Sequence, residues 1–364
     1  MENRKKLTEA DLLAALSRGE VTLPPLTITD TNVRGFGDNF DATVELRWKS
    51  RKYRFAIECK SSWYPKAIKE AAENLRRASL PSSLYPLILT PYLPEQQLSY
   101  LEGEQISGLD LCGNGVIVVP SELLVYRTGT PNRFRGEGAI KNVYRRNSSI
   151  VARLFLLKSE FETVSEALAE ITRLGGKVTL GTVSKVCKAL EDDLVLERWR
   201  EASLWGRQLR LLQADKLLDR LVENYEGPEI NASFTGKTAL SIERLRESLE
   251  KWEKRTQGQV VKTGIESVED YAVMARQSVS SFYCSDLQSL LKWLKNDVQE
   301  TARFANVNIL ETRDEFVYFD RRANFAASPI QTYLELSTGD KRDRETADQV
   351  RRIILGPLLN RQEG

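Results

Sequence analysis

Polar and apolar residues alternate along two neighbouring stretches of the chain, residues 41–48 (DATVELRW) and 53–60 (YRFAIECK). Alternation with a period of two is typical of strands that bury one face. The intervening KSRK segment is short and polar, as expected of a turn. The pattern therefore predicts a β-hairpin, and it is the clearest local signal in the sequence.

Other stretches show either helical spacing of apolar residues or short apolar runs. Helices are predicted at residues 6–18, 65–79, 94–103, 148–158, 164–174, 180–192, 209–225, 238–255, 285–296 and 344–355. Strands are predicted at residues 85–90, 115–119, 304–310, 315–319 and 330–336. A stretch rich in Gly, Pro, Asn and Arg, residues 128–149, predicts a linker. Domains have about 100–200 residues, so we expect an α/β (mixed α+β) protein in three parts: 1–130, 131–200 and 201–364.

The amino-acid composition excludes several kinds of catalytic and metal site. The chain has no histidine, which excludes Ser-His-Asp and Cys-His catalysis and zinc sites with imidazole ligands. Its four cysteines form no C-x-x-C motif, and it has no long apolar run. We therefore expect a reduced, cytoplasmic protein that does not enter a membrane. The formal net charge is only +2, so a nucleic-acid surface would have to be a local patch.

A symmetric turn in the hairpin would place every apolar residue on one face. It pairs Trp48 with Tyr53, Leu46 with Phe55, Val44 with Ile57, and Ala42 with Cys59. The opposite face then carries Asp41 across from Lys60, and Thr43 across from Glu58. A slip by one residue would send the apolar side chains to the wrong face, so the pattern argues for this register.

Asp41, Glu58 and Lys60 thus form a candidate catalytic group, with Asp41 and Glu58 as metal ligands. Two neighbouring carboxylates can hold Mg²⁺, which prefers oxygen ligands and keeps some of its water. An adjacent ammonium group can position the attacking water and stabilise charge on a phosphate. The alternative is a solvated hairpin face, on which a pair such as Asp41–Lys60 contributes less than about 1 kcal/mol.

These residues resemble the D…E-x-K pattern of the PD-(D/E)XK restriction-endonuclease-like fold, over roughly residues 1–127. The resemblance implies a nuclease-like domain in which an acid of the first helix, here Glu9, joins the site. Phe40 stands where the family's Pro precedes the first Asp. Many proteins of this fold bind nucleic acid without cutting it.

Residues 148–198 resemble a winged helix-turn-helix. Thr163 and Glu166 are placed as a helix-capping box, and Gly175-Gly176 follow as a stop. The next helix carries an apolar stripe and an opposite polar side that could meet DNA, formed by Thr179, Thr182, Ser184, Lys185 and Lys188. The alternative is an ordinary three-helix packing module.

Positive charge is concentrated beside this region. Residues 131–158 hold seven Lys or Arg residues against one acid. Such a local excess is the electrostatic footprint of nucleic-acid binding. The candidate DNA contacts among them are Arg133, Arg135, Arg145 and Arg146.

Three strings together are similar to the antitoxin-type regulators of abortive-infection type IV toxin–antitoxin systems, the AbiEi-like family. They are residues 106–118 (ISGLDLCGNGVIV), the helix-turn-helix region, and residues 328–355, which begin SPIQTYLEL. The resemblance implies a DNA-binding regulator with a C-terminal α/β domain, often encoded beside a nucleotidyltransferase-type toxin. The helix-turn-helix is internal here, whereas compact antitoxins of this kind place it at the N-terminus.

Three smaller signals remain. Asp110 and Asn114 flank a turn, which we interpret as a tight turn with Asn and Gly at positive φ rather than as a catalytic element. Gln331, Glu335 and Arg342 are interpreted as bracing a strand–helix junction, with no chemistry assigned. Trp63 and Tyr64 follow Lys60 closely, where they could stack on an unpaired base.

The leading hypothesis is a regulator of transcription or mobile-element defence that binds double-stranded DNA through a winged helix-turn-helix. The alternative is a Mg²⁺-dependent endonuclease that the helix-turn-helix directs to DNA. A third hypothesis is that the C-terminal domain binds a protein, with a cognate toxin or a second copy of the chain as candidate partners.

Overall fold

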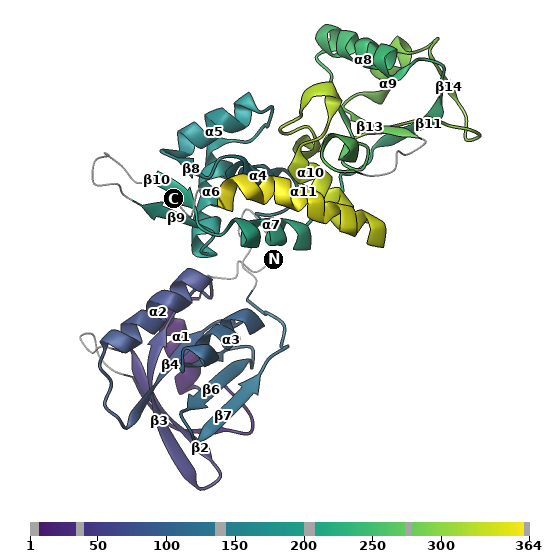
Figure 1. Ribbon diagram of the computed structural model, residues 1–364. Coiled ribbons are helices and arrows are strands. Elements are labelled where there is room, and N and C mark those ends of the chain that lie inside the picture. Colours follow the sequence, from purple (N-terminus) through teal and green to yellow (C-terminus); the bar gives the residue numbers. More distant parts are fainter. Residues whose placement is uncertain (1–6, 34–39, 135–142, 200–207, 274–278, 360–364) are drawn as a thin grey trace. The chain divides into compact units, whose positions relative to one another are not determined.

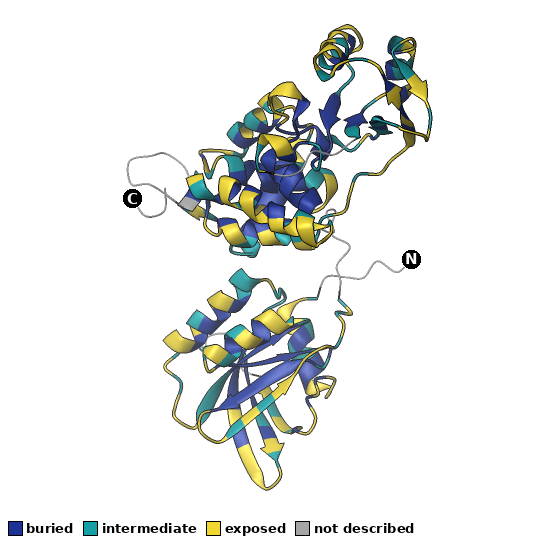
Figure 2. Cartoon of the chain, turned by 45° about the vertical axis from the view of Figure 1, so that its right-hand side comes forward, coloured by how far each residue is buried: buried dark blue, intermediate teal, exposed yellow. Residues whose placement is uncertain are grey.

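The computed structural model describes residues 7–33, 40–134, 143–199, 208–273 and 279–359. The chain divides into two compact units, Met1–Ala139 and Ile140–Gly364 (Figure 1). Each unit has its own clusters of buried apolar side chains. Figure 2 colours the buried residues of both units dark blue. The fold is of the mixed α/β class that the sequence predicts.

The described residues of the first unit form a single sheet with three helices. Its helices are α1 (Glu9–Ser17), α2 (Pro65–Arg77) and α3 (Glu95–Gly103). Its strands are β1 (Thr27–Val33), β2 (Ala42–Trp48), β3 (Arg51–Cys59), β4 (Leu84–Thr90), β5 (Ser107–Asp110), β6 (Gly115–Val119) and β7 (Leu123–Arg127). The helices and strands predicted between residues 6 and 119 are confirmed, with ends shifted by a few residues.

The seven strands lie in the sheet in chain order. The pairs β3–β4 and β4–β5 are parallel, and the other neighbours are antiparallel. Parallel neighbours need a crossover connection, which α2 and α3 provide. One apolar cluster joins α1 to one face of β2 and β3, and another joins α2 and α3 to the opposite face.

The predicted hairpin register is wrong by two residues. Ala42 pairs with Ile57 rather than with Cys59, and Trp48 pairs with Arg51 rather than with Tyr53. The turn therefore consists of two residues, and the first of them, Lys49, has φ of 54°. A shift by two leaves every side chain on its own face, so the apolar pattern cannot distinguish the two registers.

The described part of the second unit begins with three helices and a small sheet. They are α4 (Ser149–Leu157), β8 (Glu160–Phe161), α5 (Val164–Arg173), α6 (Leu180–Asp192), β9 (Leu196–Trp199) and β10 (Gln208–Leu211), with the one-turn helix η1 (Arg146–Ser148) before α4. The Thr163 cap and the glycine stop are present: the Thr163 side chain accepts from the backbone N–H of Glu166, and Gly175 has φ of 83°. The Glu166 carboxylate of the predicted capping box accepts the backbone N–H of Glu162 at 2.7 Å. Strand β10 lies between β8 and β9, so this small sheet extends beyond residue 200.

The rest of the second unit contains a five-stranded sheet and further helices. The strands are β11 (Ala232–Thr238), β12 (Val260–Lys262), β13 (Ser280–Cys284), β14 (Val298–Glu300) and β15 (Val307–Glu311), in the order β12-β13-β15-β11-β14. The helices are α7 (Ala214–Glu223), α8 (Ile242–Thr256), α9 (Leu287–Trp293), α10 (Pro329–Ser337) and α11 (Lys341–Leu359), with short turns η2 (Val268–Asp270), η3 (Glu315–Val317) and η4 (Ala323–Phe325). One apolar cluster runs continuously through α4, α5, α6, α7, α10 and α11.

Three predicted elements of this unit are wrong. Residues 208–211 form a strand rather than the start of a helix, and 315–317 form a helical turn rather than a strand. Residues 330–336, predicted as a strand, lie in α10, which begins at Pro329 with Ser328 as its cap. Helix α10 is buried on all sides, so its apolar residues show no clear period.

Candidate functional site

Four charged residues of the first unit form what we call the acid–lysine cluster: Glu9, Asp41, Glu58 and Lys60. The Nζ atom of Lys60 lies 2.8 Å from Oε1 of Glu58 and 3.9 Å from Oε1 of Glu9. Glu58 is only 8% exposed and also accepts a hydrogen bond from the amide of Asn74, a residue of α2, at 3.0 Å. Asn74 lies 16 residues from Glu58 in the chain, and no sequence pattern predicts this contact.

The corrected register changes the partner of Asp41. It was expected to lie across from Lys60, with Thr43 across from Glu58, but Thr43 pairs with Ala56. Because Ala42 pairs with Ile57, the register continued by one residue sets Asp41 opposite Glu58. Oδ2 of Asp41 accepts the backbone N–H of Cys59 at 2.7 Å, which holds the carboxylate at the end of β3.

Lys60 carries a positive charge in this setting. Burial by itself would lower its pKa, but the hydrogen bond to Glu58 and the negative charges of Glu58, Glu9 and Asp41 outweigh burial and raise the pKa. The neighbouring thiol of Cys59 is fully buried, and burial together with the charge of Asp41 raises its pKa. Lys60 can therefore stabilise negative charge, but it is not set up to accept a proton.

The carboxylates of the acid–lysine cluster meet some of the requirements of a hard divalent cation. Asp41 and Glu58 supply carboxylate oxygens from adjacent strand ends, which Mg²⁺ prefers. Among the described residues, however, no three acidic or thiol side chains lie close enough together to hold a metal ion. A cation here would thus have at most two carboxylates and would keep several of its water ligands.

The second candidate surface is the polar side of α6, formed by Thr179, Thr182, Ser184, Lys185 and Lys188. Thr179 caps the helix by accepting the N–H of Thr182. Ser184, Lys185 and Lys188 are exposed, and the opposite side of α6 packs into the core. Lys188 pairs with Asp192 at 3.0 Å, an exposed pair that is worth little and could be exchanged for a phosphate.

The structure gives other partners to the arginines that were grouped with this surface. Arg145 pairs with Glu226 at 2.6 Å, and Arg146 lies within 4 Å of Glu226, Glu229 and Asp314. These carboxylates compensate much of the local positive excess. Arg133 donates to the backbone carbonyl of Leu111 in the first unit, and Arg135 lies outside the described residues.

Sequence reasoning missed a buried polar network between α4 and α10. The guanidinium of Arg153 donates to Oε1 of Gln331 at 2.8 Å, and the Gln331 amide donates to Oε1 of Glu335 at 2.7 Å. Oε2 of Glu335 accepts the N–H of Gly264 at 2.7 Å. Burial lowers the pKa of Arg153 to about 10 and raises that of Glu335. The available signal was an arginine within the apolar run of α4.

This network changes the interpretation of the C-terminal motif. Gln331 connects α10 to Arg153 of α4, and Glu335 connects α10 to the backbone just after β12 and to the hydroxyl of Tyr283 in β13. The two residues therefore link α10 to a helix as well as to the sheet. Arg342 lies exposed on α11.

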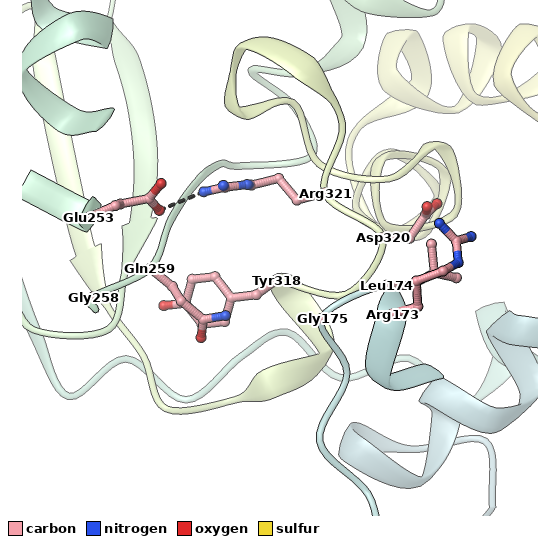
Figure 3. Close-up of a pocket in the computed structure, with 9 residues that line it drawn as sticks. All are labelled: Arg173, Leu174, Gly175, Glu253, Gly258, Gln259, Tyr318, Asp320 and Arg321. Atoms are coloured by element: carbon pink, nitrogen blue, oxygen red, sulfur yellow. Dashed lines mark hydrogen bonds and ion pairs between the residues drawn. The ribbon is translucent and has the colours of Figure 1, made fainter. Parts of the chain in front are cut away.

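A cavity of about 420 Å³ lies beside the turn between α5 and α6 (Figure 3). Four charged side chains are on its wall, and each already has an opposite charge as its partner. Arg321 pairs with Glu253, Asp320 with Arg322, and Arg173 with Glu170. The wall therefore offers no uncompensated charge to a charged ligand.

Comparison with known proteins returns no match: no family model, no curated protein and no solved structure is similar to this chain. Among the described residues, no helix is long and apolar enough to cross a membrane.

Proposed function

We propose that this protein binds double-stranded DNA through α6 and acts as a regulator of transcription or mobile-element defence. The supporting observation is the order α4-β8-α5-α6-β9-β10, which is the element order of a winged helix-turn-helix, with an exposed polar side on α6. In such motifs the second helix of the helix-turn-helix enters the major groove, and short polar or basic side chains near its start contact bases and phosphates.

The regulatory role and a cognate toxin as partner rest on the resemblance to AbiEi-like antitoxins. A second copy of the chain is the other candidate partner. Dimers of helix-turn-helix proteins bind two half-sites about one helical turn apart, so a palindromic target would support a homodimer.

The test of DNA binding is the double variant Lys185→Ala plus Lys188→Ala. A duplex is first selected from a random library by the wild-type protein, and its affinity is then measured over a range of salt concentrations. Loss of two phosphate contacts should weaken binding and make the slope of log affinity against log salt shallower by about two.

The matched control is Lys251→Ala plus Lys254→Ala, which removes the same charge from the exposed side of α8. If both double variants bind the duplex like the wild type, α6 is not the DNA-binding helix.

A second function is favoured by the acid–lysine cluster. We propose that the first unit is a Mg²⁺-dependent DNA endonuclease of the PD-(D/E)XK type. The supporting observation is that α1-β1-β2-β3-α2-β4 follows the helix–three strands–helix–strand order of that fold, with Glu9, Asp41, Glu58 and Lys60 gathered at one end of β2 and β3.

In this proposal Asp41 and Glu58 would hold the cation, which when bound would polarise the scissile phosphate and its attacking water. The chain's own contribution is positional. Asn74 and Lys60 orient Glu58, and the Cys59 N–H orients Asp41. The charged Lys60 then stabilises negative charge that develops on the phosphate.

Cleavage is tested on plasmid, linear duplex and single-stranded DNA, each with Mg²⁺ or with EDTA. Asp41→Asn and Lys60→Met should each abolish Mg²⁺-dependent cleavage and leave duplex affinity unchanged. The control is the pair Glu45→Gln and Lys52→Met on the same hairpin, whose side chains also lie 2.8 Å apart but belong to no cluster. Absence of cleavage by the wild type would remove this second function and leave the first.

A further inference from the structure

Three aromatic side chains meet beside the acid–lysine cluster: Trp63, Tyr64 and Tyr92. The rings of Trp63 and Tyr64 are stacked, with centroids 5.9 Å apart and planes 28° apart. The ring of Tyr92 meets that of Trp63 edge-on, at 6.3 Å and 88°. We call these three residues the aromatic cluster.

The aromatic cluster does not belong to the hydrophobic core. Both buried clusters of the first unit consist of other residues. Tyr64 is 44% exposed, and Trp63 and Tyr92 are half-buried. Tyr64 is therefore at the surface, with the partly covered rings of Trp63 and Tyr92 beside it, and exposed aromatic area next to polar groups is a feature of binding sites.

The aromatic cluster lies close to Glu58 and Lys60. Trp63 is three residues beyond Lys60, which limits the separation of their Cα atoms to about 11 Å. Tyr92 follows β4, the parallel neighbour of β3, and the backbone N–H of Lys60 donates to the carbonyl of Leu89 at 2.9 Å. The segments that carry Trp63 and Tyr92 thus leave the sheet at the same end of the neighbouring strands β3 and β4. A distance of about 11 Å corresponds to about three stacked nucleotides, so one strand of DNA could reach both clusters.

The segment that carries Tyr92 is held firmly by Asp110, a carboxylate that is 1% exposed. It accepts the backbone N–H groups of Leu93, Cys112 and Asn114 at 2.8–2.9 Å. The Thr90 hydroxyl donates to the carbonyl of Tyr92 at 2.9 Å.

Asp110 therefore acts through the backbone, as the tight-turn interpretation expects. Gly113 adopts the positive φ, at 96°. Asn114 was expected to do so too, but it instead bonds Asp110 and Thr130 through its side chain. The result is a rigid support for the Tyr92 ring, and a preorganised ring loses little entropy on binding.

We propose that the aromatic cluster stacks on the base of an unpaired nucleotide, so that the first unit takes DNA with a single-stranded stretch. The inference rests on the proposed function of the acid–lysine cluster as a phosphodiester site. Base faces are covered in a duplex and available in a single strand, and stacking on an aromatic ring is indifferent to sequence. The base would lie on the exposed Tyr64 ring, with its backbone directed toward Lys60.

The test measures binding of the full chain to a labelled single-stranded oligonucleotide and to a duplex, both in EDTA so that no cleavage occurs. Trp63→Ala plus Tyr64→Ala should weaken single-strand affinity by about 10- to 100-fold, the usual effect of losing an aromatic stacking partner. Duplex affinity should stay within about twofold, because α6 carries it in the proposal.

Two controls separate stacking from damage to the fold. Trp63→Phe plus Tyr64→Phe keeps the rings and should keep single-strand affinity. Tyr126→Ala removes another exposed tyrosine of the same unit and should have no effect. If the phenylalanine variant loses single-strand affinity as fully as the alanine variant, the stacking proposal is wrong.

The outcomes also distinguish this proposal from the nuclease proposal. A wild-type protein that cleaves DNA with Mg²⁺ but whose alanine variant binds single strands normally overturns stacking and leaves cleavage standing. Loss of single-strand binding in the alanine variant, with no cleavage by the wild type, supports stacking and removes the nuclease function. A wild type that does not bind single strands overturns the stacking proposal.

Discussion

Lys60 is the residue that balances charge in the acid–lysine cluster, because Glu58 is almost fully buried and depends on it. Lys60→Met should lower the free energy of unfolding by about 1–3 kcal/mol, since a buried carboxylate loses its cationic partner. Adding Glu58→Gln should restore part of that loss. Urea unfolding of the single and double variants measures the coupling free energy between Lys60 and Glu58.

Lys52→Met is the comparison for this prediction, because Lys52 is exposed and pairs with Glu45 at the surface. It should change the unfolding free energy by less than about 0.5 kcal/mol. Equal effects at Lys60 and Lys52 would contradict the dependence of Glu58 on its partner.

Asp320 makes stability depend on pH. Burial raises the pKa of Asp320 to about 6, although Arg322 opposes the rise. The unfolded value is about 3.9, so folding favours the protonated acid, and this contribution to stability is complete below about pH 4 and lost as the pH rises through 6. Asp320→Asn cannot ionise, so its stability relative to the wild type should rise between pH 4 and 7, by at most about 3 kcal/mol.

Urea unfolding at several pH values checks the Asp320 prediction. Asp348→Asn, at an exposed position of α11, serves as the reference variant and should follow the wild-type curve. Parallel curves for the wild type and Asp320→Asn would show that Asp320 does not titrate in this range.

Helix α10 depends on the buried network that joins it to α4. Gln331 lies between the charges of Arg153 and Glu335 and bonds to both. Gln331→Ala should therefore destabilise the protein by about 2–4 kcal/mol, because two buried charged groups lose a partner together. Gln288→Ala, on the exposed side of α9, should cost less than about 0.5 kcal/mol in the same denaturation experiment. A similar effect at the two positions would mean that the network contributes nothing.

The sequence predicts correctly whether a segment is a helix or a strand where one side of that segment is buried and the other is exposed to solvent. The hairpin strands and α6 show this, because their two faces differ in composition. Helix α10 was mistaken for a strand because burial on every side removes the period that identifies a helix. In the candidate site, the spacing of Asp41, Glu58 and Lys60 along the hairpin predicts that they lie together. The contact between Asn74 and Glu58 is not predictable in this way, because Asn74 lies on a separate helix.

At the scale of the whole molecule, the first unit should fold without the second. It has complete hydrophobic clusters on both faces of its sheet. A fragment of residues 1–139 should unfold cooperatively, and Phe55→Ala within it should lower the unfolding free energy by about 3–5 kcal/mol through the cavity it leaves. Thermal unfolding followed by circular dichroism is the measurement. A non-cooperative transition in the fragment would contradict this.

A fragment that ends at the predicted boundary, residues 131–200, should not fold. It lacks β10, which lies between β8 and β9, and it lacks Gln331 and the Phe316 carbonyl, to which Arg153 donates. Residues 140–364 should give a stable fragment. Sharp, dispersed amide signals from residues 131–200 alone would show that the helical region is an independent domain.

The sequence by itself determined which side of each amphipathic strand and helix is buried, because apolar periodicity depends only on neighbours along the chain. It also determined that any catalysis here works without histidine. Tertiary structure alone decided the hairpin register, the pairing of Arg145 and Arg146 with distant acids, and the network between α4 and α10. The ion pairs and the buried network join residues that are far apart in the chain, so neighbouring residues do not predict them. The two hairpin registers have the same apolar pattern, and only packing in three dimensions selects between them.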